Sequence, residues 1–500
     1  MFHFKSIYAA PAIVFLMGGT AHAALTADQV WQSWKDGAAL AGLTVTAATE
    51  ANSGGVLTLN GVSIQPEGAP AAFTISDMTL TEQGDGSVVI RPGAAMGVDY
   101  AMDKNTAKVA VVHDGLNIVA RQEGDALLYD FSADKLDVDV DIAYPGYSWD
   151  ETVKDPMVST AVKVWFVDLA GSYSDAAGAN RAFGLDIKAS ELAYDMDTED
   201  QGLKMKNRGH SQTSDVVMGL KVTLPSTTPM ASIERPADFR KVTEEGFAVD
   251  MTYQQGGNSG TVVQEDEFFP YEMTLTGDPS YGTMLFNKDV FDLKSSGDGI
   301  KMVMTSPAIP TPVEVSVGEV VMNMVLPVMA TTPADLGLQM KLTQLTLNDG
   351  VWGLFDPGAA LKREPLDLNV DVTGRSTLDL IGMAEADETG AMPPIPAPEK
   401  LDITDITLKV AGAALNATGA FTFDNAMGMP MPLGEANVNV TGANALIDGL
   451  IKTGLLAEED AMGARMMMGM FMTPTGDDAL TSKIEAKEGF AIFVNGQQIQ

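Results

Sequence analysis

Apolar and polar residues alternate with a period of two along most of the chain. In the clearest segment, Leu136, Val138, Val140 and Ile142 alternate with three aspartates. Successive side chains of a β-strand point to opposite faces of its sheet, so this segment predicts a strand with one apolar and one solvated face. Similar strand patterns occur at 56–59, 73–80, 88–90, 216–224, 247–253, 301–304, 313–321, 342–347, 366–372, 403–410, 414–423 and 434–441.

Turn residues separate these segments. Asn60-Gly61 and Gly84-Asp85-Gly86 each follow a strand pattern and predict tight turns, and residues 255–258 (Gln-Gly-Gly-Asn) end another strand. Long helical segments between the strands are scarce, which favours antiparallel pairing. The predicted fold is therefore mainly β, with one or two long, curved antiparallel sheets and a minor α+β character.

The period changes to that of a helix near both ends. Thr26 and Gln29 form a capping-box pattern, and Val30, Trp34, Ala38 and Ala41 then recur at helical spacing until Gly42. Two further helices are predicted at 444–456 and 458–472, before a hairpin at 482–499 that turns near 487–489. The expected architecture thus has an N-terminal helix and C-terminal helices beside the sheet.

Proline clusters suggest where the chain divides. Prolines recur between Pro307 and Pro312. A second cluster at 393–396 lies in the segment 392–398, which follows an acidic stretch and resembles a linker. The predicted organisation is an N-terminal β-rich domain at 24–306 and a C-terminal β-rich domain at 307–500 with helices near 444–472. The hexapeptides 75–80 and 403–408 share four identities, which leaves a duplication of the sheet open.

The first 23 residues have the pattern of a secretory signal. Lys5 precedes an apolar run at 7–17, and Ala21-His22-Ala23 is a small-x-small cleavage pattern, so cleavage is predicted between Ala23 and Ala24. We expect export, to the periplasm in a Gram-negative cell. No later segment reaches about 18 uncharged apolar residues, so no transmembrane segment is expected in the mature chain.

Composition excludes several classes of function. The formal net charge of −36 would repel phosphate backbones, so nucleic acid is not an expected partner. The chain has no cysteine, which rules out disulfides, thiolate metal sites and a cysteine nucleophile.

No residue pattern indicates catalysis. Only His113 and His210 follow the predicted cleavage site, and neither lies near a Gly-x-Ser-x-Gly motif. Nucleotide-binding motifs are absent, and the abundant carboxylates single out no catalytic pair. The aspartates at 137, 139 and 141 lack the glycine and distal glutamate of an EF-hand loop. We expect no catalytic, cofactor-binding or metal-binding residues, and a protein that is not an enzyme.

Methionine is unusually frequent, with 30 residues in the chain. It clusters at 427–431 and again at 462–472. Flexible thioether side chains fill irregular cores, which is the favoured interpretation, but they also line adaptable apolar surfaces. A copper site would usually include His or Cys partners, which are lacking here. The candidate ligand-binding residues are Met462, Met466, Met467, Met470 and Phe471.

A turn motif precedes the strand at 366–372. It contains Trp352, Asp356-Pro357 and Arg363-Glu364-Pro365. Proline fixes φ and disfavours helix before it, so each proline marks a turn. Asp356 is expected to accept hydrogen bonds from nearby backbone, and Arg363 is expected to pair with Asp356.

This motif and the segments after it resemble a known family. The Trp-x-x-Phe-Asp-Pro and Arg-x-Pro elements, the strands at 366–372, 401–423 and 434–441 and the helix at 444–456 are similar to an alphaproteobacterial exported domain-of-unknown-function family, number twenty-one twenty-five. The resemblance implies no activity. It implies a distant likeness to AsmA-like proteins, which are associated with the envelope and with lipid homeostasis, although those usually keep an N-terminal membrane anchor.

Three functions remain open at this point. The favoured hypothesis is a non-enzymatic periplasmic envelope protein that binds a lipid or another hydrophobic ligand on a concave sheet face. A structural or protein-binding scaffold with a closed core is the alternative, and a hydrolase of envelope polymers is the third. An open face lined by Met and Leu would favour the ligand-binding protein. Sheet faces packed against each other would favour the scaffold, and a cleft with converging carboxylates or His113 would favour the hydrolase.

Overall fold

The computed structural model describes residues 24–40, 43–66, 68–124, 126–176, 178–225, 227–228, 233–426 and 428–500. The predicted signal segment at 1–23 and Met427 lie outside these ranges, as do Ala41 and Gly42 at the predicted end of the first helix.

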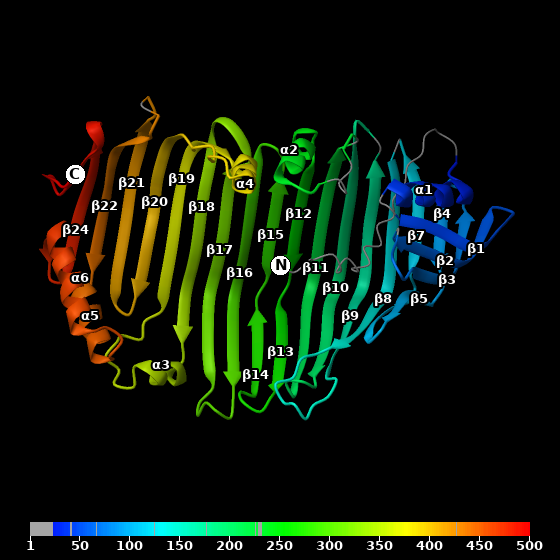
Figure 1. Ribbon diagram of the computed structural model, residues 1–500, viewed down its shortest axis with the longest axis horizontal. Coiled ribbons are helices and arrows are strands. Elements are labelled where there is room, and N and C mark those ends of the chain that lie inside the picture. The colour runs from blue at the N-terminus through cyan, green and yellow to red at the C-terminus, as the bar shows by residue number, and fades with distance from the viewer. Residues whose placement is uncertain are drawn as a thin grey trace.

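The described residues form one antiparallel sheet of 26 strands, seen face-on in Figure 1. The strands of the first half are β1 (Leu43–Ser53), β2 (Val56–Pro66), β3 (Phe73–Glu82), β4 (Val88–Pro92), β5 (Met96–Met102), β6 (Asn105–Asp114), β7 (Asn117–Glu123), β8 (Ala126–Pro145), β9 (Met157–Ala176), β10 (Asn180–Asp200), β11 (Met205–Pro225), β12 (Ala248–Gln255), β13 (Asn258–Glu265), β14 (Tyr271–Gly277) and β15 (Ser280–Phe286). Those of the second half are β16 (Val290–Thr305), β17 (Val313–Pro327), β18 (Met329–Leu347), β19 (Leu366–Asp379), β20 (Pro398–Val410), β21 (Ala413–Asp424), β22 (Met431–Thr441), β23 (Thr473–Gly476), β24 (Ala479–Lys487), β25 (Ala491–Val494) and β26 (Gln497–Gln498).

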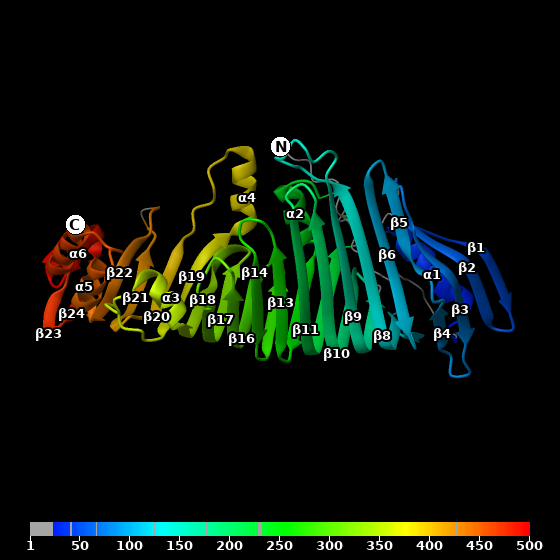
Figure 2. The same ribbon diagram turned by 90° about the horizontal axis from the view of Figure 1, so that it is seen from below.

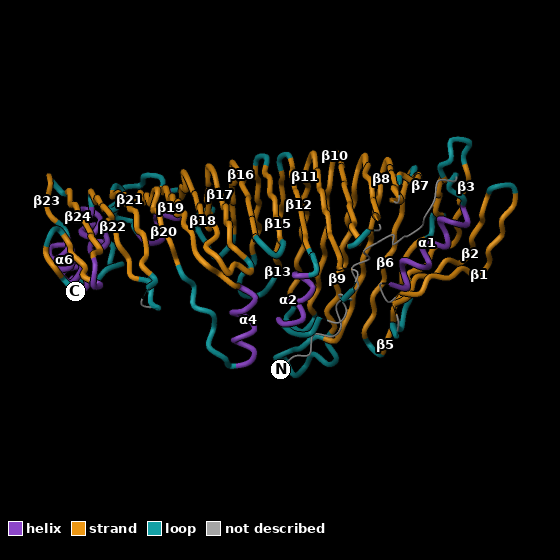
Figure 3. Tube along the Cα trace, turned by 90° about the horizontal axis from the view of Figure 1, so that it is seen from above, coloured by secondary structure: helices purple, strands orange, loops and turns teal. Residues whose placement is uncertain are grey.

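The helices lie between or beside these strands. They are α1 (Ala27–Leu40), α2 (Pro236–Glu244), α3 (Asp349–Phe355), α4 (Leu380–Thr389), α5 (Ala443–Lys452) and α6 (Glu458–Phe471). Helix α1 lies at one end of the sheet and α5 and α6 at the other (Figure 1), and α2 and α4 project from one face (Figures 2 and 3).

The spatial order of the strands follows the chain. Long strands pair with their neighbours in sequence, and four places in the sheet are shared by two short strands in line, β4 with β5, β6 with β7, β12 with β13, and β14 with β15. Such a meander needs only short turns and confirms the mainly β, antiparallel prediction. The predicted domain boundary after residue 306 falls between β16 and β17, which pair from Val290↔Pro327 to Met304↔Val313.

A row of β-bulges crosses the sheet, and we call it the crease. Left-handed backbone occurs at Asp168 on β9, Asp215 on β11, Gly299 on β16 and Gln344 on β18, with φ between 49° and 56°. Two features require glycine at position 299. Its φ of 56° is left-handed, and a Cβ there would lie 2.0 Å from Asp278 Oδ2.

The crease shifts the phase of the apolar alternation without changing the apolar face. Tyr129 and Ala133 of β8 are buried before the crease, and Leu136 and Val138 after it pack against the same core. A bulge adds one residue to a strand, which exchanges odd and even positions between the two faces. One face of each long strand therefore stays apolar from end to end.

Helix α1 covers this face at the N-terminal end. Its capping box is confirmed, because Thr26 N donates to Gln29 Oε1 (2.9 Å) and Gln29 N to Thr26 Oγ1 (3.2 Å). Val30, Trp31 and Trp34 are buried in a core with side chains from β2, β3, β4, β7, β8 and β9. This end of the sheet has a closed apolar core.

Two local predictions are wrong. Asn60-Gly61 is no hairpin turn, because β2 runs through it with a bulge at Gly61 (φ 58°), and the turn lies at Gly54-Gly55. Helix α5 ends at Lys452 rather than near 456, since Gly454 adopts a left-handed φ of 76°. Helix α4, in the acidic stretch before the predicted linker, is an element for which the sequence pattern made no prediction.

Candidate functional site: the uncovered apolar face

A continuous line of apolar side chains crosses the middle of the sheet. Strand register places one residue of each strand opposite the next, and we call the set the central apolar row: Leu185, Leu220, Met251, Met284, Leu293, Met324, Leu338, Val372 and Ile403. Neighbouring strands lie about 4.8 Å apart, so the row is about 40 Å long. Every member is half-buried or exposed, and none is fully buried.

The row begins where the closed core ends. Tyr173 of the core pairs with Leu185 in register, and its ring stacks on Phe183 with 6.5 Å between centroids. A parallel line of exposed side chains runs two residues away and includes Met218, Met322 and Met340. In the described part of the chain, no second sheet covers this stretch, so its apolar surface faces outward.

The opposite face of the same strands is polar. Asn323 donates to Gln339 Oε1 (2.7 Å), and Lys341 pairs with Glu319 (2.6 Å). Adjacent residues, such as Asn323 and Met324, therefore lie on chemically different faces.

A hollow of about 710 Å³ lies mainly on the polar face, between β8 and β13. Asp139, Lys163, Asp195 and His210 are among its lining, and Asp195 Oδ1 lies 2.8 Å from His210 Nδ1. Asp195 and His210 are both exposed, and Lys163 pairs with Asp137 at 3.6 Å. His113 lies elsewhere, with Nε2 3.4 Å from the Gly93 carbonyl. Among the described residues no group of three or more His, Asp or Glu side chains is placed to hold a metal ion.

Two helices border the apolar face at one edge of the sheet. Helix α2 contacts β15 through Phe239, whose ring centroid lies 5.6 Å from that of Phe286, and Phe247 packs against both. Phe286 is on the apolar side of β15, two residues beyond Met284. Helix α2 therefore rests on the apolar face rather than on the polar one.

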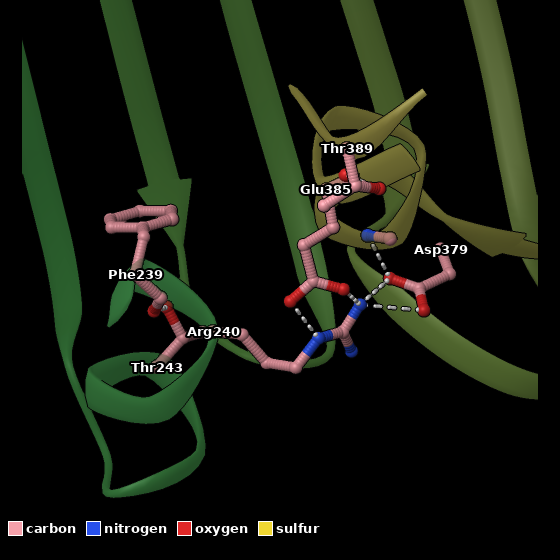
Figure 4. Close-up of polar contacts among 7 residues, drawn as sticks. Phe239, Arg240, Thr243, Asp379, Glu385 and Thr389 are labelled. Atoms are coloured by element: carbon pink, nitrogen blue, oxygen red, sulfur yellow. Dashed lines mark hydrogen bonds and ion pairs between the residues drawn. The ribbon is translucent and has the colours of Figure 1, made fainter. Parts of the chain in front are cut away.

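Arg240 joins α2 to α4, as Figure 4 shows. Its guanidinium donates to Glu385 through Nε (2.8 Å) and Nη2 (3.0 Å) and to both carboxylate oxygens of Asp379 (2.9 Å each). Hydrogen bonding to Glu385 and Asp379 raises the pKa of Arg240, so it stays charged. One side chain thus holds together helices that lie more than 130 residues apart in sequence.

The methionines predicted as ligand residues lie on α6, at the C-terminal end of the sheet. Met462, Met466, Met467 and Met470 are 59–69% exposed, and Phe471 is 38% exposed. The core-filling interpretation is therefore wrong for these methionines: the small residue Ala461 is the buried one, and the long side chains point away. The structure does not bring these five residues to the central apolar row (Figure 1).

The turn motif forms largely as predicted. Asp356 is buried and accepts from the backbone N–H of Ala360 (2.8 Å) and Leu361 (2.9 Å). The predicted Arg363–Asp356 pair is wrong, because both Asp356 oxygens are used by these backbone groups and Arg363 pairs with Asp349 instead. Its guanidinium lies 5.9 Å from the Trp352 ring centroid, which fixes α3 against the turn.

The proline positions follow the same prediction. Pro357 directly follows the buried Asp356 and Pro365 directly precedes β19, so both lie in the connection between α3 and that strand. The motif therefore shapes a connection and lies apart from the central apolar row.

Comparison with known proteins places the C-terminal part of the chain. In the described residues, no helix has the length and hydrophobicity needed to cross a bilayer. No curated protein matches the chain. The distant likeness to AsmA-like proteins stays a prediction. Residues 289–491, from the start of β16 to the start of β25, match the family model described as "Uncharacterized protein conserved in bacteria (DUF2125)", so the resemblance to that family is confirmed over this part of the chain.

Proposed function

We propose that this is a non-enzymatic envelope protein of the periplasm that holds a lipid, or another molecule with long hydrocarbon chains, on its uncovered apolar face. The observation that carries the proposal is the central apolar row. It presents nine apolar side chains on nine successive positions of the sheet, over about 40 Å; the first, Leu185, packs against the closed core, and none of the nine is fully buried.

The chemistry of the row favours a hydrocarbon ligand. Soluble proteins rarely expose contiguous apolar patches larger than a few hundred Å², so such a face is typical of a binding surface. Met251, Met284 and Met324 lie among leucines in the row, and flexible thioethers adapt to chains of different shape. The row holds no charged group that would select one headgroup.

The two other hypotheses gain less support. A scaffold with a closed core fits only the end of the sheet under α1, where the buried cluster is confined. A hydrolase would use the polar hollow, where His210 pairs with Asp195 and both side chains are exposed. Neither feature explains why the apolar face continues for another nine strand positions.

Native mass spectrometry of the chain from Ala24, purified gently from its own periplasm and followed by organic extraction, tests the proposal. Reproducible adducts of lipid mass that detergent displaces are expected. The variant M251E/M324E places charges in the row and should lose the adduct by about tenfold or more, since each charge opposes contact with hydrocarbon.

The matched control carries the same charges on the other face. Thr252 and Asn323 are the neighbours of Met251 and Met324 in sequence and lie on the polar face, so T252E/N323E should keep the adduct. Loss of the adduct in both variants would point to general destabilisation. A mass free of adducts that stays so after incubation with phospholipid would refute lipid binding.

A further inference from the structure

Exposed aromatic side chains gather in three loops at one edge of the sheet. These loops are 146–156 between β8 and β9, 201–204 between β10 and β11, and 266–270 between β13 and β14. We call their exposed apolar residues the aromatic edge: Tyr147, Trp149, Leu203, Phe268 and Phe269. Trp149 is 81% and Phe268 88% exposed, so neither contributes to a core.

Strand pairing places the three loops at the same edge. Pro145 pairs with Met157, Asp200 with Met205, and Lys206 of β11 with Glu265 of β13. This is the lower edge in Figure 1, opposite α2 and α4. Figures 2 and 3 show the long loop between β8 and β9 projecting toward the same side of the sheet as α2 and α4, which is the side of the apolar face.

Polar contacts hold the first two loops together. Ser148 Oγ donates to the Gly202 carbonyl (3.0 Å), and Lys204 Nζ donates to Asp150 Oδ2 (3.0 Å). Hydrogen bonds from Thr152 and Lys204 lower the pKa of Asp150, so this link is kept at neutral pH. The rings of Tyr147 and Trp149 meet edge to face at 4.9 Å and remain outside these contacts.

Hydrogen bonds to one carboxylate also fix the third loop, which carries the two phenylalanines. The Asp266 carboxylate accepts from the backbone N–H of Phe268 (2.6 Å) and of Phe269. The hydrogen bond from Phe269, the largest cause, lowers the pKa of Asp266, so the turn stays anionic. The carboxylate thus occupies the inside of the turn and leaves the two rings on its outside.

An apolar path connects the aromatic edge with the sheet. The Phe269 ring lies 6.2 Å from that of Tyr271, and Tyr271, Met273 and Leu275 then alternate along one face of β14 toward the crease. Met273 and Leu275 pair in register with Met304 and Met302 of β16. A hydrocarbon chain could follow this path without crossing a charged side chain.

We propose that the aromatic edge docks on a lipid bilayer of zwitterionic headgroups, from which ligands reach the apolar face. Tryptophan and other aromatic side chains favour the boundary between headgroups and hydrocarbon, and apolar area buried there supplies the affinity. The loops hold five carboxylates against two lysines, on a chain of net charge −36, so an anionic surface would repel them. The inference rests on the proposed function only for the identity of the cargo.

Flotation of the chain from Ala24 with phosphatidylcholine vesicles tests the docking. The variant W149S/F268S should bind these vesicles at least about tenfold more weakly, because it removes the two most exposed rings. The control M392S/I395S removes side chains of 85% and 67% exposure from the loop after α4, at the opposite edge, and should bind like wild type. Both variants should keep the wild-type Tm, since all four side chains are exposed.

A second readout reports the depth of the ring itself. Phosphatidylcholine with brominated acyl chains should quench wild-type tryptophan fluorescence, and W149F should lose most of that quenching. Adding phosphatidylglycerol to the vesicles should weaken binding at low salt.

The outcomes separate this inference from the proposed function. No binding to neutral vesicles, or equal binding by W149S/F268S, overturns the inference and leaves the aromatic edge as a surface for a protein partner. Lipid adducts that persist in W149S/F268S after delivery from detergent micelles would then still support the proposed function. Vesicle binding without any adduct in wild type would refute the proposed function alone.

Discussion

The covered and the uncovered stretch of this sheet are built from the same strands and differ in what lies on their apolar face. Under α1, Leu57, Leu59 and Leu80 are buried to 2% exposure or less, whereas Leu293 and Leu338 of the central apolar row are only half-buried. Alternation, antiparallel pairing and the crease are common to both stretches. Alternation alone therefore forms the sheet, while a covering helix decides whether its apolar face becomes core or surface.

The same substitution, leucine to alanine, should destabilise the covered stretch far more than the uncovered one. Leu59→Ala in the covered stretch should lower the free energy of unfolding by about 3–4 kcal/mol, because it removes a fully buried side chain and leaves a cavity. Leu338→Ala in the row should cost about 1 kcal/mol, since that side chain already contacts solvent.

Native-state hydrogen exchange measures both losses locally, at β2 and at β18, and does not require the long meander to unfold in one step. Equal losses at the two sites would show that something covers the row in solution. That result would contradict the comparison.

Strand alternation made most of the sheet predictable from sequence. Each strand pattern lies inside an observed strand to within one residue, because a half-buried strand in a meander follows a period of two whatever its neighbours do. The capping box at Thr26 and the helix at 458–472 were also predictable, since caps and helical periodicity act within a few residues. The resemblance to the family rests on the turn motif, whose buried Asp356 bonds backbone within five residues.

The candidate site was much harder to predict. The central apolar row joins residues from nine strands, and its register depends on the bulges of the crease, which the sequence marks only by isolated residues such as Gly299. Asn60-Gly61 shows the difficulty, because the same dipeptide serves a turn or a bulge. Arg240 offered no local signal, since Asp379 and Glu385 lie far along the chain.

The second effect is a loss of stability at alkaline pH that should arise in the covered stretch. Burial raises the pKa of Tyr129, and burial together with the charge of Asp175 raises the pKa of Tyr173. Unfolded tyrosine titrates near pH 10, so above about pH 10 the unfolded chain loses protons that the folded protein keeps. The free energy of unfolding therefore keeps its full value, as far as these two tyrosines are concerned, below about pH 10. Above that pH it decreases by up to about 1.4 kcal/mol per pH unit for each tyrosine.

An alkaline titration followed by tryptophan fluorescence and tyrosinate absorbance would detect the transition, because Trp31 and Trp34 lie in the same core. Y129F/Y173F should flatten the dependence on pH. If the double variant unfolds at the same alkaline pH as wild type, the covered core does not set the transition.

The smallest of these effects concerns Arg240, at the border of the uncovered stretch. Arg240→Ala removes the hydrogen bonds that join α2 to α4 and leaves Asp379 and Glu385 facing each other, so protection of both helices from hydrogen exchange should fall by about 1–2 kcal/mol. Exchange in α1 and β2 should not change, because α2 and α4 lie over the middle strands of the sheet, away from α1 (Figure 1). Lys241→Ala is the matched control, since Lys241 is exposed and its contact with Glu245 is 4.0 Å long.

A loss of protection confined to α2 would show that α4 is held by its own buried side chains, Ile381 and Ala386, and that Arg240 does not stabilise it. A loss in both helices would instead mean that this edge of the apolar face is closed by a single side chain, and R240A should then also exchange its lipid adduct faster than wild type.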